Sequence, residues 1–157
     1  MSETRRKFIS KTLTLLAACS GTWAASLLMP KAALAAWREE HFAETGLKQT
    51  LQRLYGDHKI TDSKKISIRI PRIAEDGAVV PFTVKSSLAN VENIRIFVAR
   101  NPVPLVASVN LMPEAMAYFS ARLKMAETSD VIAIVKTTDG YFRARKKVKV
   151  TLGGCGG

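Results

Sequence analysis

From Ile66 to the end of the chain, hydrophobic and polar residues alternate in short runs, and turn residues separate these runs. A period of two places successive side chains on opposite faces of a β-strand, so each run predicts a strand with one buried face. The predicted strands contain Ile66, Ile68 and Ile70; Val80, Phe82 and Val84; Ile94, Ile96 and Val98; Leu105, Ala107, Val109 and Leu111; residues 131–136; and Val148, Val150 and Leu152. The nearly continuous apolar run at residues 131–136 is typical of a central strand.

Two Asp-Gly pairs mark turns between the runs. Asp76-Gly77 separates the first two runs, and Asp139-Gly140 follows the central one. Asp-Gly is favoured in tight hairpins because both central residues there adopt positive φ. The run that contains Phe119, Ala121, Leu123 and Met125 fits either a strand or a short helix. Roughly seven short strands in about 90 residues predict a mainly β fold, an immunoglobulin-like β-sandwich.

A helical pattern precedes the strands, at residues 37–55. One face of this segment carries three leucines, Leu47, Leu51 and Leu54. Their spacings of four and three residues are those of neighbours on a helix face. Thr45 is the expected N-cap and Gly56 the expected end. We therefore expect a short amphipathic helix that lies against the body of the protein or against a partner.

The first 35 residues have the features of an export signal. Arg5-Arg6 and the apolar residues that follow Lys7 resemble a twin-arginine signal, and an Ala- and Leu-rich stretch occupies residues 12–29. Ala33-Leu34-Ala35 provides small residues where a signal peptidase requires them. Cleavage is therefore expected after Ala35, with export by the twin-arginine pathway to the periplasm.

Two other interpretations of this segment stay open. A transmembrane anchor would need roughly 20 sustained apolar residues, whereas Ser20, Gly21 and Thr22 interrupt this run. A lipoprotein signal is suggested by Leu16-Ala17-Ala18-Cys19, a short pattern that is common by chance in such sequences.

Length and the signal together define the domain organisation. Residues 1–35 form the cleaved signal, residues 36–65 the N-terminal helical segment, residues 66–152 the sandwich, and residues 153–157 a glycine-rich tail. The mature part is long enough for one hydrophobic core and too short for two.

The chain is strongly basic. Its net charge is +11 at pH 7, and it falls to about +7 once the five basic residues and one acidic residue of the signal are removed. A basic surface attracts anions and speeds their encounter with the protein. An exported protein rarely meets nucleic acid, so we interpret the basic stretch at residues 143–149 as the solvated face of a strand.

The cysteines point most directly to chemistry. The chain has two, and Cys19 leaves with the signal, so the mature protein retains only Cys155. A single cysteine in an exported protein indicates either an intermolecular disulfide or a reactive free thiol. Four glycines flank it: Gly153, Gly154, Gly156 and Gly157. Because glycine has no Cβ, the chain around this thiol is thin and permissive, and the five-residue arm extends at most roughly 17 Å. It can therefore enter a narrow pocket of another protein.

Other chemical groups in the sequence are weak candidates. His41 and His58 stand alone, so no ligand set for zinc or haem is formed, and Glu39-Glu40 fits an exposed helix surface. The absence of a nearby base argues against a cysteine hydrolase, although His58 could meet the thiol in space. We predict no metal, no cofactor and no catalytic residue in this chain.

Over essentially its full length the sequence resembles the SoxY family, the carrier subunits of the sulfur-oxidation (Sox) system, and the twin-arginine signal agrees with this resemblance. The tail at residues 150–157 is similar to the family's C-terminal glycine-glycine-cysteine-glycine-glycine motif. Residues 73–81 resemble its turn, with Asp76 in place of the expected asparagine, and Asn101-Pro102-Val103-Pro104 agrees as well. The resemblance implies an immunoglobulin-like, non-catalytic carrier whose attachment site is Cys155 and whose flanking glycines form the arm.

The resemblance also implies partners. A c-type cytochrome enzyme would join thiosulfate oxidatively to Cys155, a hydrolase would release sulfate, and a sulfane dehydrogenase would oxidise the remaining sulfur. A smaller β-sandwich subunit, SoxZ, would form a heterodimer with the carrier. Two alternatives remain at this stage: an immunoglobulin-like interaction module with an interchain disulfide through Cys155, and a thiol enzyme.

Overall fold

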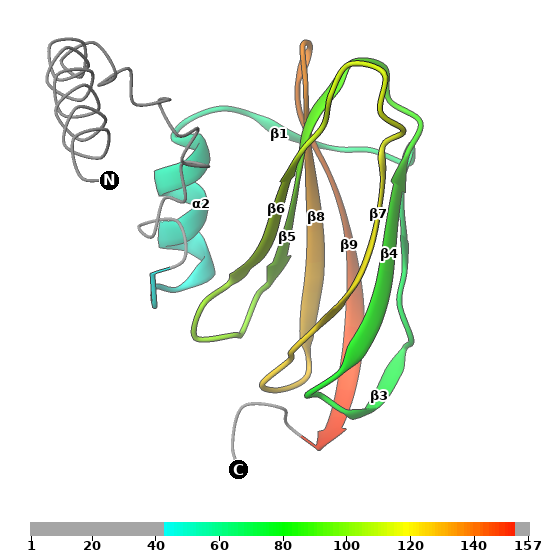
Figure 1. The fold of residues 1–157 in the computed structure, drawn as a ribbon. Coiled ribbons are helices and arrows are strands. Elements are labelled where there is room, and N and C mark those ends of the chain that lie inside the picture. The colour runs from blue at the N-terminus through cyan, green and yellow to red at the C-terminus, as the bar shows by residue number, and fades with distance from the viewer. Residues whose placement is uncertain (1–42, 153–157) are drawn as a thin grey trace, which may run out of the picture. The chain divides into compact units, whose positions relative to one another are not determined.

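The computed structural model describes residues 43–152, which form one short helix followed by nine strands (Figure 1). The elements are α2 (Leu47–Tyr55), β1 (Ile60–Asp62), β2 (Ile66–Arg69), β3 (Ile73–Asp76), β4 (Val80–Ser86), β5 (Val91–Val98), β6 (Leu105–Asn110), β7 (Tyr118–Leu123), β8 (Ser129–Thr137) and β9 (Gly140–Leu152). The predicted mainly β class and the helix before the strands are confirmed. Within residues 43–152 there is no helix whose length and apolar character would let it cross a bilayer.

The strands form two sheets that face each other (Figure 1). The larger sheet has the order β1-β9-β8-β5-β6, with β3 also pairing with β9, and the smaller sheet has the order β2-β4-β7. Between them lies a fully buried core that includes Val80, Val84, Ile94, Ile96, Val98, Val131, Ala133, Val135 and Val148. Each of these valine and isoleucine side chains stabilises the fold by about 1.5–3 kcal/mol when it leaves water. The alternation in the sequence therefore predicted these core residues, but it wrongly grouped Leu105 with Ala107, because the strand pairing shifts at this point and Leu105 packs in a different cluster.

The N-cap of the helix lies one residue after the predicted one. Gly46 is the N-cap of α2 and no side chain caps the helix, so the prediction of Thr45 was wrong. The reason is that the Thr45 hydroxyl lies 2.9 Å from the hydroxyl of Thr50 instead of accepting a first-turn N–H. Gly56 ends the helix as predicted, with φ of 53°, and its N–H donates to the Gln52 carbonyl. Residues 37–42 of the predicted helix lie outside the described residues.

A second apolar cluster holds α2 against the outer face of the larger sheet. Tyr55 packs there with Phe97, Leu105 and Ile134, all of them nearly or completely buried, and the three predicted leucines surround them. The Arg95 guanidinium lies 5.4 Å from the centre of the Tyr55 ring. Burial raises the pKa of Tyr55 to about 12, against the opposing effect of the Arg95 charge. The helix therefore lies against the body of the protein, which is the first of the two positions expected from the sequence.

Several local expectations needed correction. The sequence pattern did not predict the short strands β1 and β3, and the ambiguous run at residues 119–125 forms strand β7. In the β8–β9 hairpin, Thr137 pairs with Gly140, so the two turn residues are Thr138 and Asp139 rather than Asp139-Gly140. Gly140 has φ of 133°, whereas Asp139 does not have a positive φ. The Thr137 hydroxyl accepts the Asp139 N–H at 3.1 Å and so stabilises this different turn.

Candidate functional site

Strand β9 carries the chain through the middle of the larger sheet towards the predicted carrier arm. It is thirteen residues long and ends at Leu152, three residues before Cys155. Cys155 and its four flanking glycines lie outside the described residues. The described part of the site is therefore its base, residues 150–152, which we call the arm root.

The turn that resembles the family motif holds one edge of the arm root. Strand β3 runs parallel to β9, with Asp76 opposite Leu152. The Gly77 N–H donates to the Leu152 carbonyl at 2.8 Å, and the Gly77 carbonyl accepts the Met125 N–H at 2.7 Å. The Asp76 carboxylate accepts the Ala78 N–H at 2.7 Å and closes the turn. Gly77 thus joins the last residue of β9 to the loop between β7 and β8.

Threonine hydroxyls complete the attachment. On the β8 side, the Thr128 hydroxyl accepts the Val150 N–H at 3.0 Å and lies 3.4 Å from the Val150 carbonyl, to which it donates. On the β3 side, the Thr151 hydroxyl donates to the Glu75 carbonyl at 2.8 Å. Buried or partly buried backbone groups need such partners. The arm root is consequently fixed on both edges of β9.

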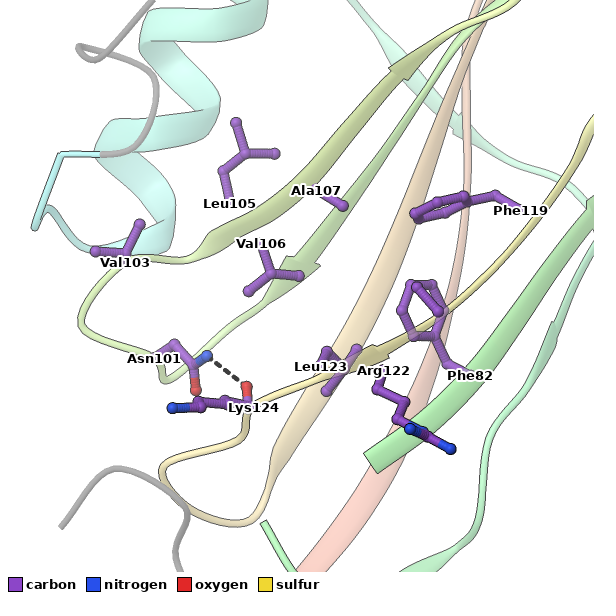
Figure 2. Close-up of a pocket in the computed structure, with 11 residues that line it drawn as sticks. Phe82, Asn101, Val103, Leu105, Val106, Ala107, Phe119, Arg122, Leu123 and Lys124 are labelled. Atoms are coloured by element: carbon purple, nitrogen blue, oxygen red, sulfur yellow. Dashed lines mark hydrogen bonds between the residues drawn. The ribbon is translucent and has the colours of Figure 1, made fainter. Parts of the chain in front are cut away.

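The asparagine of the second motif acts at the same end of the sandwich. The Asn101 amide donates to the Lys124 carbonyl at 2.8 Å, a bond drawn in Figure 2. Its carbonyl oxygen accepts the Ala126 N–H at 3.0 Å. Asn101 therefore ties the loop after β5 to the loop after β7, the same loop that Gly77 contacts through Met125.

A cleft lies between the edge strands β6 and β7 (Figure 2). Its wall is largely apolar, and the rings of Phe82 and Phe119 meet edge to face with centres 5.5 Å apart. Among the described residues that line this cleft, only Arg122 and Lys124 are ionisable. The described lining of this cleft thus contains no histidine, cysteine or carboxylate.

The structure also separates His58 from the arm. His58 lies beside Tyr141, with ring centres 5.4 Å apart, near the start of β9. The eleven residue steps from Tyr141 to Leu152 span roughly 36 Å of strand. The three steps from Leu152 to Cys155 cover at most about 11 Å. His58 therefore cannot act as a base for Cys155 of the same chain. His41, Glu39 and Glu40 lie outside the described residues, and no metal-binding group of His, Cys, Asp or Glu occurs within residues 43–152.

The basic stretch at residues 143–149 lies on β9, as the interpretation of it as a strand face predicted. Arg143 forms an ion pair with Asp62 of β1, with 2.7 Å between Nε and the carboxylate. Its hydrogen bond lowers the pKa of Asp62 and raises the pKa of Arg143 itself. The next alternate cations, Arg145, Lys147 and Lys149, are exposed.

Fold and site together define an immunoglobulin-like protein with a firmly anchored C-terminal strand and a single cysteine just beyond it. The chain matches the family described as "Sulfur oxidation protein SoxY" over residues 51–155. It belongs to this SoxY family. No curated protein sequence matches the chain.

One solved structure agrees with this family. The chain is similar to the structure of the sulfur carrier protein SoxY from Chlorobium limicola f thiosulfatophilum, with 37% identity and a TM-score of 0.62, covering 68% of this chain and 96% of that one. A superoxide reductase (neelaredoxin) from Ignicoccus hospitalis is similar at 16% identity and a TM-score of 0.49, covering 58% of this chain and 94% of that one. At these values the second similarity supports no functional argument.

Proposed function

We propose that this chain is the sulfur-compound carrier of a Sox thiosulfate-oxidation system and that Cys155 holds the sulfur intermediates covalently. Membership of the SoxY family supports the carrier role. The observation that supports Cys155 is the arm root, where backbone and threonine bonds fix β9 up to Leu152. A fixed base three residues before a thiol on a thin glycine arm defines where that thiol can be presented.

The loading step is an oxidation. The Cys155 thiol and thiosulfate form a new S–S bond, giving Cys–S–S–SO₃⁻, one proton and two electrons. A c-type cytochrome enzyme accepts the two electrons, and Cys155 itself supplies the proton. The thiolate is the nucleophilic form of cysteine, so loading requires that the thiol lose its proton. No group of this chain needs to act as an acid, a base or an electron acceptor.

The release step is a hydrolysis. Water attacks the terminal sulfur of Cys–S–S–SO₃⁻ and breaks the S–S bond to the sulfonate group, which leaves as sulfate. The persulfide Cys–S–S⁻ stays on the arm, and two protons are released to solvent. A hydrolase performs this step, and a sulfane dehydrogenase then oxidises the sulfur that remains. The carrier thus takes part in each reaction as the covalently bound substrate and not as a catalyst.

The proposal includes a compartment and a partner subunit. The twin-arginine signal with cleavage after Ala35 would deliver the folded carrier to the periplasm. There it would form a heterodimer with a SoxZ-like subunit. Export without Cys19 would leave Cys155 as the sole thiol of the mature chain.

The proposal is tested by mass spectrometry of the carrier after incubation with thiosulfate and the oxidising cytochrome enzyme. We expect the wild type to gain one thiosulfate group and Cys155→Ser to gain none, because serine cannot form the S–S bond. A Cys19→Ser variant, exported from the same host, is the matched control and should load like the wild type. Retained addition to Cys155→Ser would refute Cys155 as the attachment site.

A further inference from the structure

The outer face of β9 carries a row of cations that the carrier chemistry does not use. The side chains of Phe142, Ala144, Val148 and Val150 face the core between the sheets. Because successive strand residues alternate between faces, Arg145, Lys147 and Lys149 lie on the opposite, outer face. All three are exposed. We call these three residues the cation stripe.

The cations of the stripe are not held in ion pairs within the described residues. Within residues 43–152 none of its three members forms an ion pair, whereas the neighbouring Arg143 is paired with Asp62. Three carboxylates lie near them: Asp130 of β8 is opposite Lys147, Asp62 of β1 interacts with the charge of Arg145, and Glu75 of β3 is two residues after Ile73, the partner of Lys149. Alternate residues of a strand are about 7 Å apart, which is shorter than the Debye length of about 8 Å at physiological ionic strength. The fields of the three cations therefore add together.

The stripe leads to the arm root. Lys149 is its last member, three residues before Leu152, and its N–H donates to the carbonyl of exposed Arg72 at 2.9 Å. One exposed apolar side chain lies beside the stripe: Ile73, opposite Lys149 and 58% exposed. The chain from Leu152 to Cys155 extends at most about 11 Å, so an enzyme that receives Cys155 must come within about that distance of Leu152. It must therefore come close to Lys149 and Ile73.

We propose that the cation stripe and the neighbouring Ile73 form the docking surface for the enzymes that receive the arm, and that these enzymes present an acidic surface around the entrance to their active sites. This inference rests on the proposed carrier function. Complementary charge at the rim of an interface raises the rate of association more than the final affinity. That property suits a carrier that must bind several enzymes in turn and leave each of them.

The test compares two triple charge reversals in the whole exported protein with its partner subunit. The first replaces the stripe: Arg145→Glu, Lys147→Glu and Lys149→Glu. The matched control makes the same change in net charge at exposed cations away from the stripe: Lys48→Glu on α2, Lys59→Glu just before β1, and Lys85→Glu on β4. By strand register Lys59 is level with Gly140, five residues or roughly 16 Å from Arg145, which exceeds a Debye length, and Lys85 lies on the other sheet.

The measured quantity is kcat/KM for loading of Cys155 with thiosulfate by the cytochrome enzyme, at several salt concentrations. At low salt the stripe variant should load about tenfold more slowly or worse, and its rate should depend less on salt than that of the wild type. The control variant should stay within about twofold of the wild type. Reaction of the thiol with a small uncharged disulfide should be equal in all three proteins.

A neutral variant guards against misfolding, because Glu at position 147 would face Asp130. Replacement of the stripe by Gln avoids that repulsion and should still slow loading and flatten the salt dependence. Equal loading of the Gln variant and the wild type would overturn the docking surface while the carrier function stands. Equal slowing by the stripe and control reversals would also overturn it, since only overall charge would matter. A wild type that is never loaded at Cys155 would overturn the carrier function itself.

Discussion

Thr128 provides the sharpest test of how the arm root is built. Its hydroxyl is the partner of both the N–H and the carbonyl of Val150, at 3.0 and 3.4 Å. Thr128→Val keeps the shape of the side chain and removes both bonds. A backbone group left without a partner in a buried site costs about 1–3 kcal/mol. Val150 is only partly buried, so water can replace part of the lost interaction, and we expect a cost of about 1–2 kcal/mol.

This cost should appear locally, at the end of β9. Strand ends open in small cooperative units whose free energies are below that of global unfolding. A loss of about 1–2 kcal/mol increases amide exchange at Val150 by roughly 5- to 30-fold, because 1.4 kcal/mol corresponds to a factor of ten. Amide hydrogen exchange measured by NMR reports this directly, with Val135 in the centre of β8 as an internal reference.

Thr83→Val is the matched control for this experiment. Thr83 is on the smaller sheet, and its hydroxyl forms an exposed bond of 3.0 Å with the Ser120 hydroxyl. Surface substitutions of this kind change the free energy of unfolding by no more than about 0.5 kcal/mol. Unchanged exchange at Val150 in Thr128→Val, or an equal change in Thr83→Val, would show that the Thr128 hydroxyl does not anchor the arm root.

Two further predictions concern the helix and the arm. Tyr55 ionises at a pKa of about 12 in the folded protein, against about 10 when unfolded, so its contribution is complete below pH 10 and is lost as pH rises to 12. In denaturant titrations, the stability of the wild type relative to Tyr55→Phe should therefore fall by about 2–3 kcal/mol over that interval, and a constant difference would contradict the burial argument. Gly154→Trp should slow enzymatic loading of Cys155 without changing the melting temperature or the reaction with small disulfides, and unchanged loading would argue against a narrow entrance.

The alternating pattern of the sequence was enough to predict the strands that line the core. Val80, Phe82 and Val84 repeat every second residue, and all three are buried. Such strands are specified by the burial of one face, which a single sequence records directly. The helix was predicted for the same reason, since its leucines pack on the larger sheet.

The missed elements depend on partners that are distant in the sequence. Strand β3 buries only Ala74 and is held mainly by its backbone pairing with β9, so its side chains carry little periodic signal. The Asp76-Gly77 turn was predicted, but its bond to Leu152 was not, because the two segments are 75 residues apart. The bond between the Thr128 hydroxyl and the Val150 N–H was not predicted for the same reason, since these two residues are 22 apart in the sequence. Sequence reasoning thus predicts the thiol and its arm, while only the fold shows how the base of that arm is fixed.

The most direct test of the carrier role is intact-mass spectrometry of the protein isolated from cells grown on thiosulfate, followed by fragmentation of its C-terminal peptide. The account predicts a mixture of free thiol, persulfide and thiosulfate-derived adducts, all of them on Cys155. A single stoichiometric interchain disulfide at Cys155, or sulfur adducts that map elsewhere in the chain, would contradict it.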